Sequence, residues 1–331
     1  MRFLVLGGTK FVGRAFVEEA LAAGHEVTLF NRGRTHPELF PEVEKLHGDR
    51  RDLSAIGSRT WDAVFDPSCY VPRLARLAAQ TLRDAAPHYT FVSSLSVYAD
   101  EVTPGQDETG RLATIIDPSV EEITGETYGA LKVLSEQEVQ RVYGERALVL
   151  RPGYICGPYD GVDRMPYWLR RVERGGELLA PERPDFPVQL IDARDIAAFA
   201  QALAGRGEGG VFNLCAPPKP FGFGELLEAA AQAVGQGGLR PTWVSAEFLL
   251  EHGLDGWEAL PWWVPPAEYA VTRFDQSKAL AAGLAARPIL DSFRDCWAWD
   301  RTRGGEPLRS DRGLEPEREA ELLSAWHARE V

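Results

Sequence analysis

Residues 2–13 read RFLVLGGTKFVG, and this stretch decides the fold. The apolar run predicts a buried strand, the glycines predict a tight turn, and the segment after Gly13 has the periodicity of a helix. Glycines allow close backbone approach and the first N–H groups of a helix attract anions, so the stretch predicts a dinucleotide site. A third glycine would normally stand at Lys10. The predicted loop contacts are Gly7, Gly8, Thr9, Lys10, Phe11, Val12 and Gly13.

Short apolar runs alternate with helix-period segments through the first 150 residues or so. Strands that read as continuous apolar runs, separated by helices, indicate a parallel sheet covered on both faces. We therefore expect an α/β fold with a doubly wound, parallel Rossmann sheet. The further strands are predicted at 26–30, 43–47, 63–66, 89–93 and 147–151, with helices after Gly13 and over 127–143.

This alternation ends near residue 153, where Pro, Gly and aromatic residues become frequent. A strand, a helix and a strand within 187–214 are expected to rejoin the sheet. The predicted division is a dinucleotide-binding domain of residues 1–153 plus about 187–214, and a cap of about 154–186 and 215–331. This smaller, discontinuous C-terminal cap is expected to bind the substrate over the carboxyl ends of the strands.

The composition is that of a globular protein, and we expect it in the cytoplasm. The net charge of −13 disfavours contact with nucleic acid, and no run of 18 apolar residues predicts a membrane span. The four cysteines are far apart and are expected to be buried thiols. The six histidines have no metal-binding spacing, so no catalytic metal is expected.

The end of the second predicted strand bears on the choice of dinucleotide. Sites for NAD(H) usually place Asp or Glu there to bind the ribose 2′-hydroxyl, whereas this chain has Asn31, Arg32 and Arg34. Arginines form charge-assisted hydrogen bonds with a 2′-phosphate, and Lys10 could add a cation from the loop opposite. NADP(H) is therefore favoured. In the alternative, Asn31 binds the plain ribose of NAD(H) and the three cations are surface charges.

Two residues after the third predicted strand extend this site. Asp49 lies where a carboxylate can accept a hydrogen bond from an adenine amino group. Arg50 follows it and is also predicted to contact the cofactor.

The helix predicted over 127–143 carries the candidate catalytic pair. Tyr128 and Lys132 are four residues apart and hence on one face, and Ser94 follows the fifth predicted strand. A phenol with a pKa of about 10 is a poor base at neutral pH. A lysine cation about 4.5 Å away, at an effective dielectric of about 20, would stabilise the phenolate by about 3.7 kcal/mol. Lys132 is therefore expected to lower the pKa of Tyr128 by two to three units, roughly.

Together these segments resemble a known family. GGTKFVG, GD at 48–49, VSSLSVY, YGALK, LRPGYICGP and DARDIA occur in the order seen in extended short-chain dehydrogenase/reductases, the NAD-dependent epimerase/dehydratase family. The glycine loop also looks like that of an atypical branch that includes chloroplast RNA-associated proteins. The resemblance implies that Tyr128 is the general acid/base, that Lys132 binds the nicotinamide ribose, and that Ser94 is their hydroxyl partner.

Departures from the family pattern bear on the substrate. Sugar dehydratases of the family carry Asp-Glu where this chain has Leu95 and Ser96, so dehydration is not expected. Val188 stands where enzymes like UDP-galactose 4-epimerase place an arginine for the diphosphate, so a nucleotide sugar is not favoured. Tyr154 replaces the usual Asn and is predicted to contact cofactor or substrate. The other predicted substrate residues are Tyr70 and Ser96, with Trp168, Trp262 and Trp263 as further candidates from the cap.

The favoured function is hydride transfer at a secondary alcohol or ketone of a sugar-like or other small metabolite, by an NAD(P)-dependent reductase or epimerase. The alternative is a non-catalytic dinucleotide sensor or an RNA-associated protein. The acidic charge argues against RNA, because an RNA-binding surface is usually basic. No nucleic-acid or membrane partner is expected, and a homodimer is left open.

Overall fold

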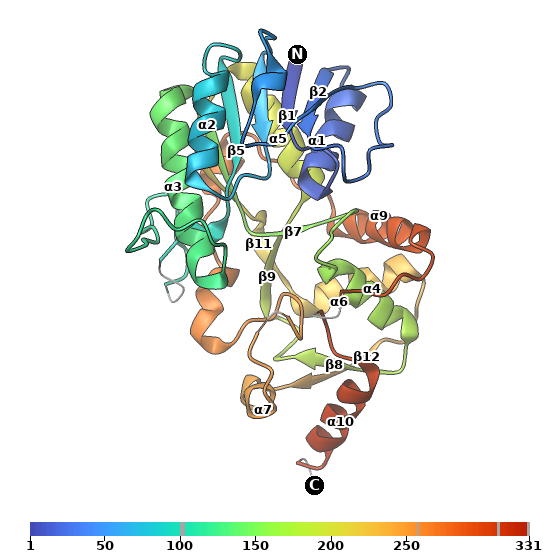
Figure 1. Ribbon diagram of the computed structural model, residues 1–331. Coiled ribbons are helices and arrows are strands. Elements are labelled where there is room, and N and C mark those ends of the chain that lie inside the picture. The colour runs from blue at the N-terminus through green and yellow to red at the C-terminus, as the bar shows by residue number, and fades with distance from the viewer. Residues whose placement is uncertain (100–102, 257, 310–311, 330–331) are drawn as a thin grey trace.

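The structure, a computed structural model, describes residues 1–99, 103–256, 258–309 and 312–329. The N-terminal part forms the upper lobe in Figure 1, and the cap forms the lower lobe with the C-terminus at its far end.

A parallel sheet of seven strands forms the centre of the upper lobe, in the order β10-β6-β5-β4-β1-β2-β3. The predicted doubly wound fold is confirmed, and the six strands predicted before residue 153 all lie in this sheet. The strands are β1 (Arg2–Leu6), β2 (Glu26–Asn31), β3 (Glu44–His47), β4 (Ala63–Asp66), β5 (His88–Val92), β6 (Ala147–Pro152) and β10 (Gly210–Leu214).

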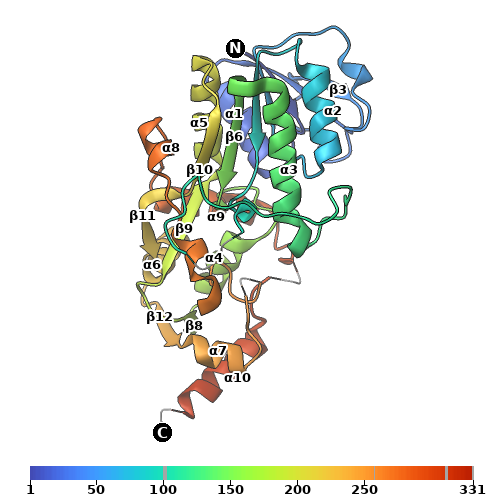
Figure 2. The ribbon, with the colours of Figure 1, turned by 90° about the vertical axis from the view of Figure 1, so that its left-hand side faces the viewer.

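Helices cover both faces of this sheet (Figure 2). Helices α1 (Phe11–Ala22) and α5 (Ala193–Arg206) pack together on one face, and α2 (Pro72–Leu82) and α3 (Gly125–Tyr143) on the other. Strand β1 shows why: Phe3 and Val5 pack into the α1/α5 core, whereas Leu4 and Leu6 pack into the α2 side. A strand segment buried on both faces must be apolar at every position, which is the pattern of residues 3–6, FLVL, after the exposed Arg2.

The cap contains two small sheets and six helices among the residues that the structure describes. One sheet joins β11 (Ala216–Gly222), β9 (Pro187–Asp192) and β7 (Tyr154–Cys156), and the other pairs β12 (Arg240–Val244) with β8 (Glu177–Pro181). The helices are α4 (Arg164–Arg174), α6 (Phe223–Val234), α7 (Ala246–Glu251), α8 (Ser277–Ala281), α9 (Ile289–Thr302) and α10 (Pro316–His327). Four 3₁₀ turns complete the described elements: η1 (Ser54–Ile56), η2 (Leu95–Val97), η3 (Gly144–Arg146) and η4 (Pro266–Thr272).

One strand lies outside the sheet in which it was predicted. Residues 187–192 were expected to rejoin the Rossmann sheet, but β9 pairs with β7 and β11. Only the following helix and strand, α5 and β10, return to the upper lobe. An apolar strand has the same sequence pattern in the Rossmann sheet and in the cap sheet, so only its pairing partner shows to which sheet it belongs.

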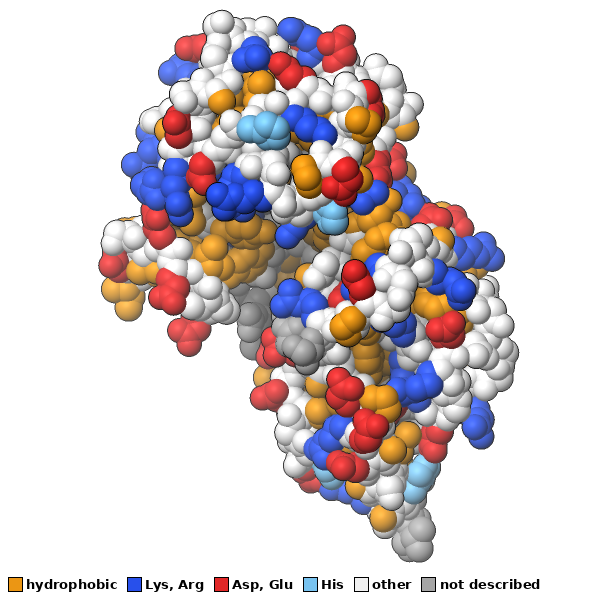
Figure 3. All heavy atoms as spheres, turned by 45° about the vertical axis from the view of Figure 1, so that its right-hand side comes forward, with side chains coloured by type: hydrophobic (Ala, Val, Ile, Leu, Met, Phe, Trp, Pro, Cys, Tyr) orange, Lys and Arg blue, Asp and Glu red, His pale blue; other side chains and the backbone are white. Residues whose placement is uncertain are grey.

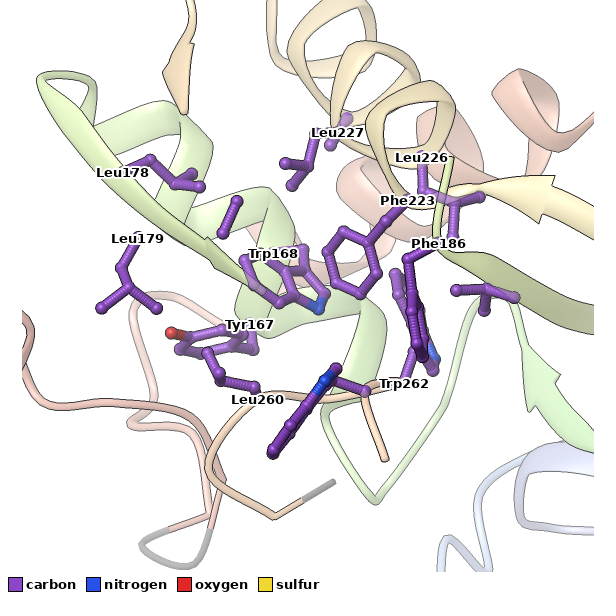
Figure 4. Close-up of a cluster of buried hydrophobic side chains, with 14 of the residues drawn as sticks. Tyr167, Trp168, Leu178, Leu179, Phe186, Phe223, Leu226, Leu227, Leu260 and Trp262 are labelled. Carbon is purple, nitrogen blue, oxygen red and sulfur yellow. The ribbon is translucent and has the colours of Figure 1, made fainter. Parts of the chain in front are cut away.

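Aromatic side chains form the centre of the cap core (Figure 4). Trp168 packs edge-on against Phe223 with ring centroids 5.2 Å apart. Trp262 and Trp263 are at most 1% exposed, so all three tryptophans proposed for the cleft are core residues instead. Val188 is buried in the same core.

The cysteines are Cys69, Cys156, Cys215 and Cys296, and all four are free and buried, as predicted. Among the described residues, no group of His, Cys, Asp or Glu could hold a metal ion. No helix of the described chain is both long enough and apolar enough to cross a membrane.

Candidate active site

A cavity of about 1400 Å³ lies between the carboxyl ends of the Rossmann strands and the cap. The glycine loop, the ends of β2 and β3, Tyr128 and Lys132 line one side, and residues of α4 and α9 line the other. In Figure 3 the surface is hollowed between the two lobes, with Lys and Arg side chains along the border.

The glycine loop leaves bare backbone at the entrance to α1. Gly7 and Gly8 have φ values of +133° and +95°, which L side chains rarely adopt. A Cβ on Gly8 would lie 2.5 Å from the Leu29 side chain, and one on Gly13 would lie 3.0 Å from the Gly8 nitrogen. The three glycines are therefore required by geometry, and they leave a cradle that fits a pyrophosphate.

Lys10 stands at the N-cap of α1 with φ −133° and ψ 142°, an extended conformation open to any L residue. No glycine is needed there. The helix has no side-chain cap and no acidic residue in its first turn, so its first N–H groups are not satisfied by a cap and can receive an anion. The glycine missing from the fingerprint therefore leaves the cradle at the start of α1 intact.

Asn31 supports this loop rather than simply facing the cavity. Its amide nitrogen donates to the Gly7 carbonyl and its oxygen accepts from the Gly33 N–H, both at 2.9 Å. Lys10, Arg32 and Arg34 are exposed at the cavity wall. All three predicted cations thus line the cavity, Lys10 at the start of α1 and the two arginines after β2.

Asp49 and Arg50, which follow β3, also line the cavity, but they differ in exposure and in hydrogen-bond partners. Asp49 is exposed, and its carboxylate accepts from the Arg51 N–H. The guanidinium of Arg50 instead forms a bidentate ion pair with Asp66, at 2.6 and 2.8 Å. Tyr89 also donates to Asp66, at 2.7 Å. Arg50 therefore pairs with the buried Asp66 carboxylate beneath the cavity, a contact that no local sequence pattern predicts.

The side chains of Tyr128, Lys132 and Ser94 come together where α3 passes the end of β5. Lys132 is 2% exposed, and its ammonium donates to the carbonyls of Cys69 and Val92, both at 2.8 Å. Ser94 lies outside the cavity wall formed by the described residues, and its hydroxyl donates to Ser96 at 3.1 Å, but it is near enough to Tyr128 to oppose the rise in the pKa of that phenol. Two of the three ammonium protons are thus used within the protein, and one remains for a ligand.

Gly129 explains how Tyr128 approaches Ser94. A Cβ on Gly129 would lie 2.0 Å from the carbonyl oxygen of Ser96, in η2. Only glycine lets α3 lie this close to the turn that carries the serines.

The electrostatics of Tyr128 differ from the prediction. Burial, reinforced by Tyr70, raises the pKa of Tyr128 to about 12, and the cation that opposes this rise is Arg164. Burial also lowers the pKa of Lys132 to about 8, against the effect of nearby Cys69 and Asp66. The expected lowering of the Tyr128 pKa by Lys132 is therefore absent from this structure.

The residues proposed for substrate binding separate into two groups. Tyr70 is 40% exposed at the cavity wall, with its ring centroid 6.2 Å from that of Tyr128 and 4.7 Å from the Lys132 ammonium. Ser96 and Tyr154 lie outside the wall formed by the described residues. Ser96 is bonded to Ser94, and Tyr154 packs against the cap core.

Comparison with known proteins agrees with the motifs. Residues 70–215 match the NAD dependent epimerase/dehydratase family. This match agrees with the resemblance seen in the motifs, over this segment of the chain. A 2′-dehydrokanamycin reductase of Streptomyces kanamyceticus is 29% identical over 76% of this chain and 71% of its own. Chloroplast stem-loop binding protein of 41 kDa b from Arabidopsis thaliana is 24% identical over 71% of this chain, and the match covers 63% of the plant protein.

Solved epimerases share the fold. UDP-N-acetylglucosamine 4-epimerase from Bacillus cereus superposes with a TM-score of 0.68 at 16% identity, covering 91% of this chain and 99% of that one. UDP-glucose 4-epimerase from Thermus thermophilus, solved with NAD, gives 0.63 at 20% identity over 92% and 100% of the two chains.

A row of contacting Arg and aromatic side chains, from α1 and from the cap, was not predicted. The Arg14 guanidinium of α1 lies 3.4 Å from the Tyr159 ring centroid, the Tyr159 and Trp299 rings are 5.6 Å apart, and Arg303 lies 5.3 Å from Trp299. We call these four residues the α1–α9 stack. Arg303 also forms an ion pair with Asp163 at 2.7 Å, across 140 positions of sequence. These residues come together only through contacts between distant segments, so no local sequence pattern predicts them.

Proposed function

We propose that this protein is an NAD(P)-dependent oxidoreductase or epimerase that transfers hydride at a secondary alcohol or ketone of a small metabolite, with Tyr128 as general acid/base. The observation that carries the proposal is that Tyr128 and Lys132 line the same cavity as a glycine cradle that fits a pyrophosphate, with Ser94 near Tyr128.

The bound dinucleotide would supply or accept the hydride. The N-terminus of α1 and the glycine loop would hold its pyrophosphate, and the remaining Lys132 proton would bind its ribose. Because the pKa of Tyr128 is raised to about 12, its hydroxyl keeps a proton at neutral pH. It can donate this proton to a ketone oxygen as the carbon is reduced, and in the opposite direction it takes the proton from the alcohol. Ser94 would orient the same oxygen.

Replacing Tyr128 with Phe tests this role. Loss of a general acid/base costs roughly 10²- to 10⁴-fold in rate, whereas dinucleotide binding should stay almost unchanged. Turnover of keto sugars with NADPH and NADH, and cofactor affinity by calorimetry, would be measured side by side. A fully active Tyr128→Phe enzyme would refute the assignment.

Reduction and epimerisation remain alternatives within this proposal. An epimerase retains its cofactor through both half-reactions, whereas a reductase releases it after each one. Mass spectrometry of the cofactor that copurifies distinguishes them: tightly held NAD⁺ favours an epimerase, and exchangeable NADPH favours a reductase.

We propose NADP(H) as the favoured cofactor, with NAD(H) as the alternative. No carboxylate stands at the end of β2, and Lys10, Arg32 and Arg34 border the cavity there. Support for the alternative comes from related structures, since that of the Thermus epimerase contains NAD.

The double change Lys10→Gln and Arg32→Gln tests this preference. We expect the affinity for NADPH to fall by at least about tenfold, because charge-assisted hydrogen bonds contribute roughly 1.5–3 kcal/mol, while that for NADH stays the same. Arg59→Gln, which removes an exposed pair with Glu44, is the control. An unchanged ratio of the two affinities in calorimetry would favour NAD(H).

The name of the Arabidopsis relative favours a second candidate, an RNA-associated role. The net charge of −13 opposes it. RNA binding that weakens steeply with added salt would reverse the order of the two proposals.

A further inference from the structure

The cavity is basic although the protein is acidic. Ten of its lining residues are Lys or Arg and three are Asp or Glu, in a chain of net charge −13. A cleft lined by one sign of charge concentrates ligands of the opposite sign. The cofactor pyrophosphate accounts for part of this charge, so the remaining question is which cations face the substrate.

Arg164 differs from the other cations of the wall. Five of the other nine are exposed: Lys10, Arg32, Arg34, Arg51 and Arg309. Arg14 pairs with Glu18, and Arg50, Lys132 and Arg303 have the partners described above. Arg164, in the first turn of α4, is 13% exposed, and its Nε has no hydrogen-bond partner. Its charge nevertheless reaches the Tyr128 hydroxyl, where it lowers the pKa that burial raises.

The carboxylate next to Arg164 does not satisfy it. Asp160 is completely buried, with its Oδ2 atom 3.7 Å from the Arg164 Nε, beyond hydrogen-bonding distance. The same Oδ2 has no hydrogen-bond partner, and burial raises the pKa of this carboxyl. A half-buried guanidinium that lines the cavity and has an incomplete ion pair can bind an oxyanion.

We propose that Arg164 binds an oxyanion of the substrate, a carboxylate or a phosphate, close to the carbon that Tyr128 serves. This inference rests on the proposed function and narrows its substrate to an acidic metabolite. Arg164 comes from the cap, so the cap supplies the selectivity while the Rossmann lobe supplies the chemistry.

Small oxyanions test the proposal without a known substrate. Protein saturated with NADP⁺ or NAD⁺, whichever binds, would be titrated calorimetrically with inorganic phosphate and with acetate. Wild-type protein should bind one of them at least about tenfold more tightly than Arg164→Gln, since hydrogen bonds between charged groups contribute roughly 1.5–3 kcal/mol. The better ligand identifies phosphate or carboxylate as the group recognised.

Two variants provide the controls. Arg164→Lys keeps the charge and should bind more tightly than Arg164→Gln, which separates charge from a folding defect. Arg301→Gln removes a cation that is 66% exposed on α9 and should bind as wild type does.

Three outcomes overturn the inference: neither anion binds the wild type, Arg164→Gln binds as tightly as wild type, or Arg164→Gln weakens the dinucleotide itself by the same factor. Each leaves the Tyr128→Phe result untouched, so failure of this inference is distinguishable from failure of the proposed function.

Discussion

The Asp66 side chain lies beneath the cavity and supports residues that line it. Its carboxylate is fully buried at the end of β4 and accepts from Arg50 and Tyr89. The same strand end leads to Cys69, whose carbonyl holds the Lys132 ammonium. The position of Lys132 therefore depends on a buried ion pair that does not itself touch the reacting atoms.

Asp66→Asn should reduce stability by about 3 kcal/mol at neutral pH, because it leaves the Arg50 charge without its partner. Urea denaturation measures this loss. The matched control is Arg73→Gln, which removes an exposed pair with Glu121 and should change stability by less than about 1 kcal/mol.

The loss of stability caused by Asp66→Asn should depend on pH. Burial raises the pKa of Asp66, but the charge and hydrogen bonds of Arg50 outweigh burial and hold it below its usual value. A lowered carboxyl pKa gives stability that is present above the unfolded value of about 3.9 and is lost as pH falls through the folded one. The difference between wild type and Asp66→Asn should therefore shrink below about pH 4. A constant difference down to pH 2 would contradict this account.

At the scale of elements, helix α3 and turn η2 form the candidate catalytic surface together. Gly129 allows their contact, with no room for a Cβ beside the Ser96 carbonyl. Alanine is favoured over glycine inside a helix by about 1 kcal/mol, so helix propensity and tertiary contact oppose each other here.

Gly129→Ala should therefore destabilise the protein and lower turnover, because α3 must move away from η2 and carry Tyr128 with it. Gly125→Ala in the same helix is the control. A Cβ there meets nothing within 4 Å, so the change should be neutral or mildly stabilising. Thermal unfolding and turnover would be measured for both variants, and equal behaviour would show that the close approach is unimportant.

The elements that could be predicted are those with a strong local pattern. Strands β1, β2, β4, β5 and β6 are largely apolar runs buried on both faces, and α1 and α3 follow loops with recognisable residues. Strand β9 has the same kind of run, yet it pairs in the cap. Pairing depends on partners distant in sequence, which periodicity does not encode.

The molecule as a whole is assembled by a chain that crosses between the lobes several times. After β7, α4, β8 and β9 in the cap, α5 and β10 return to the upper lobe, and α8 later contacts β10 again. The Rossmann side of the site lies in short motifs, each with a local pattern, and was predicted. Its cap side, Tyr159, Arg164, Trp299 and Arg303, depends on those crossings and was not.

The α1–α9 stack has an optical consequence. Eight of the nine tryptophans follow residue 153, so intrinsic emission reports chiefly on the cap. Among the described tryptophans, Trp299 is the one that lines the cavity. A dinucleotide bound in the Rossmann lobe should therefore quench emission through this one indole.

Trp299→Phe should abolish most of the quenching on addition of NADPH, whereas Trp326→Phe, on α10, should preserve it. Calorimetry would confirm that both variants still bind. Undiminished quenching in Trp299→Phe would mean that another tryptophan reports the bound dinucleotide. With this indole as reporter, cofactor exchange could be timed in a stopped-flow instrument before any substrate is known.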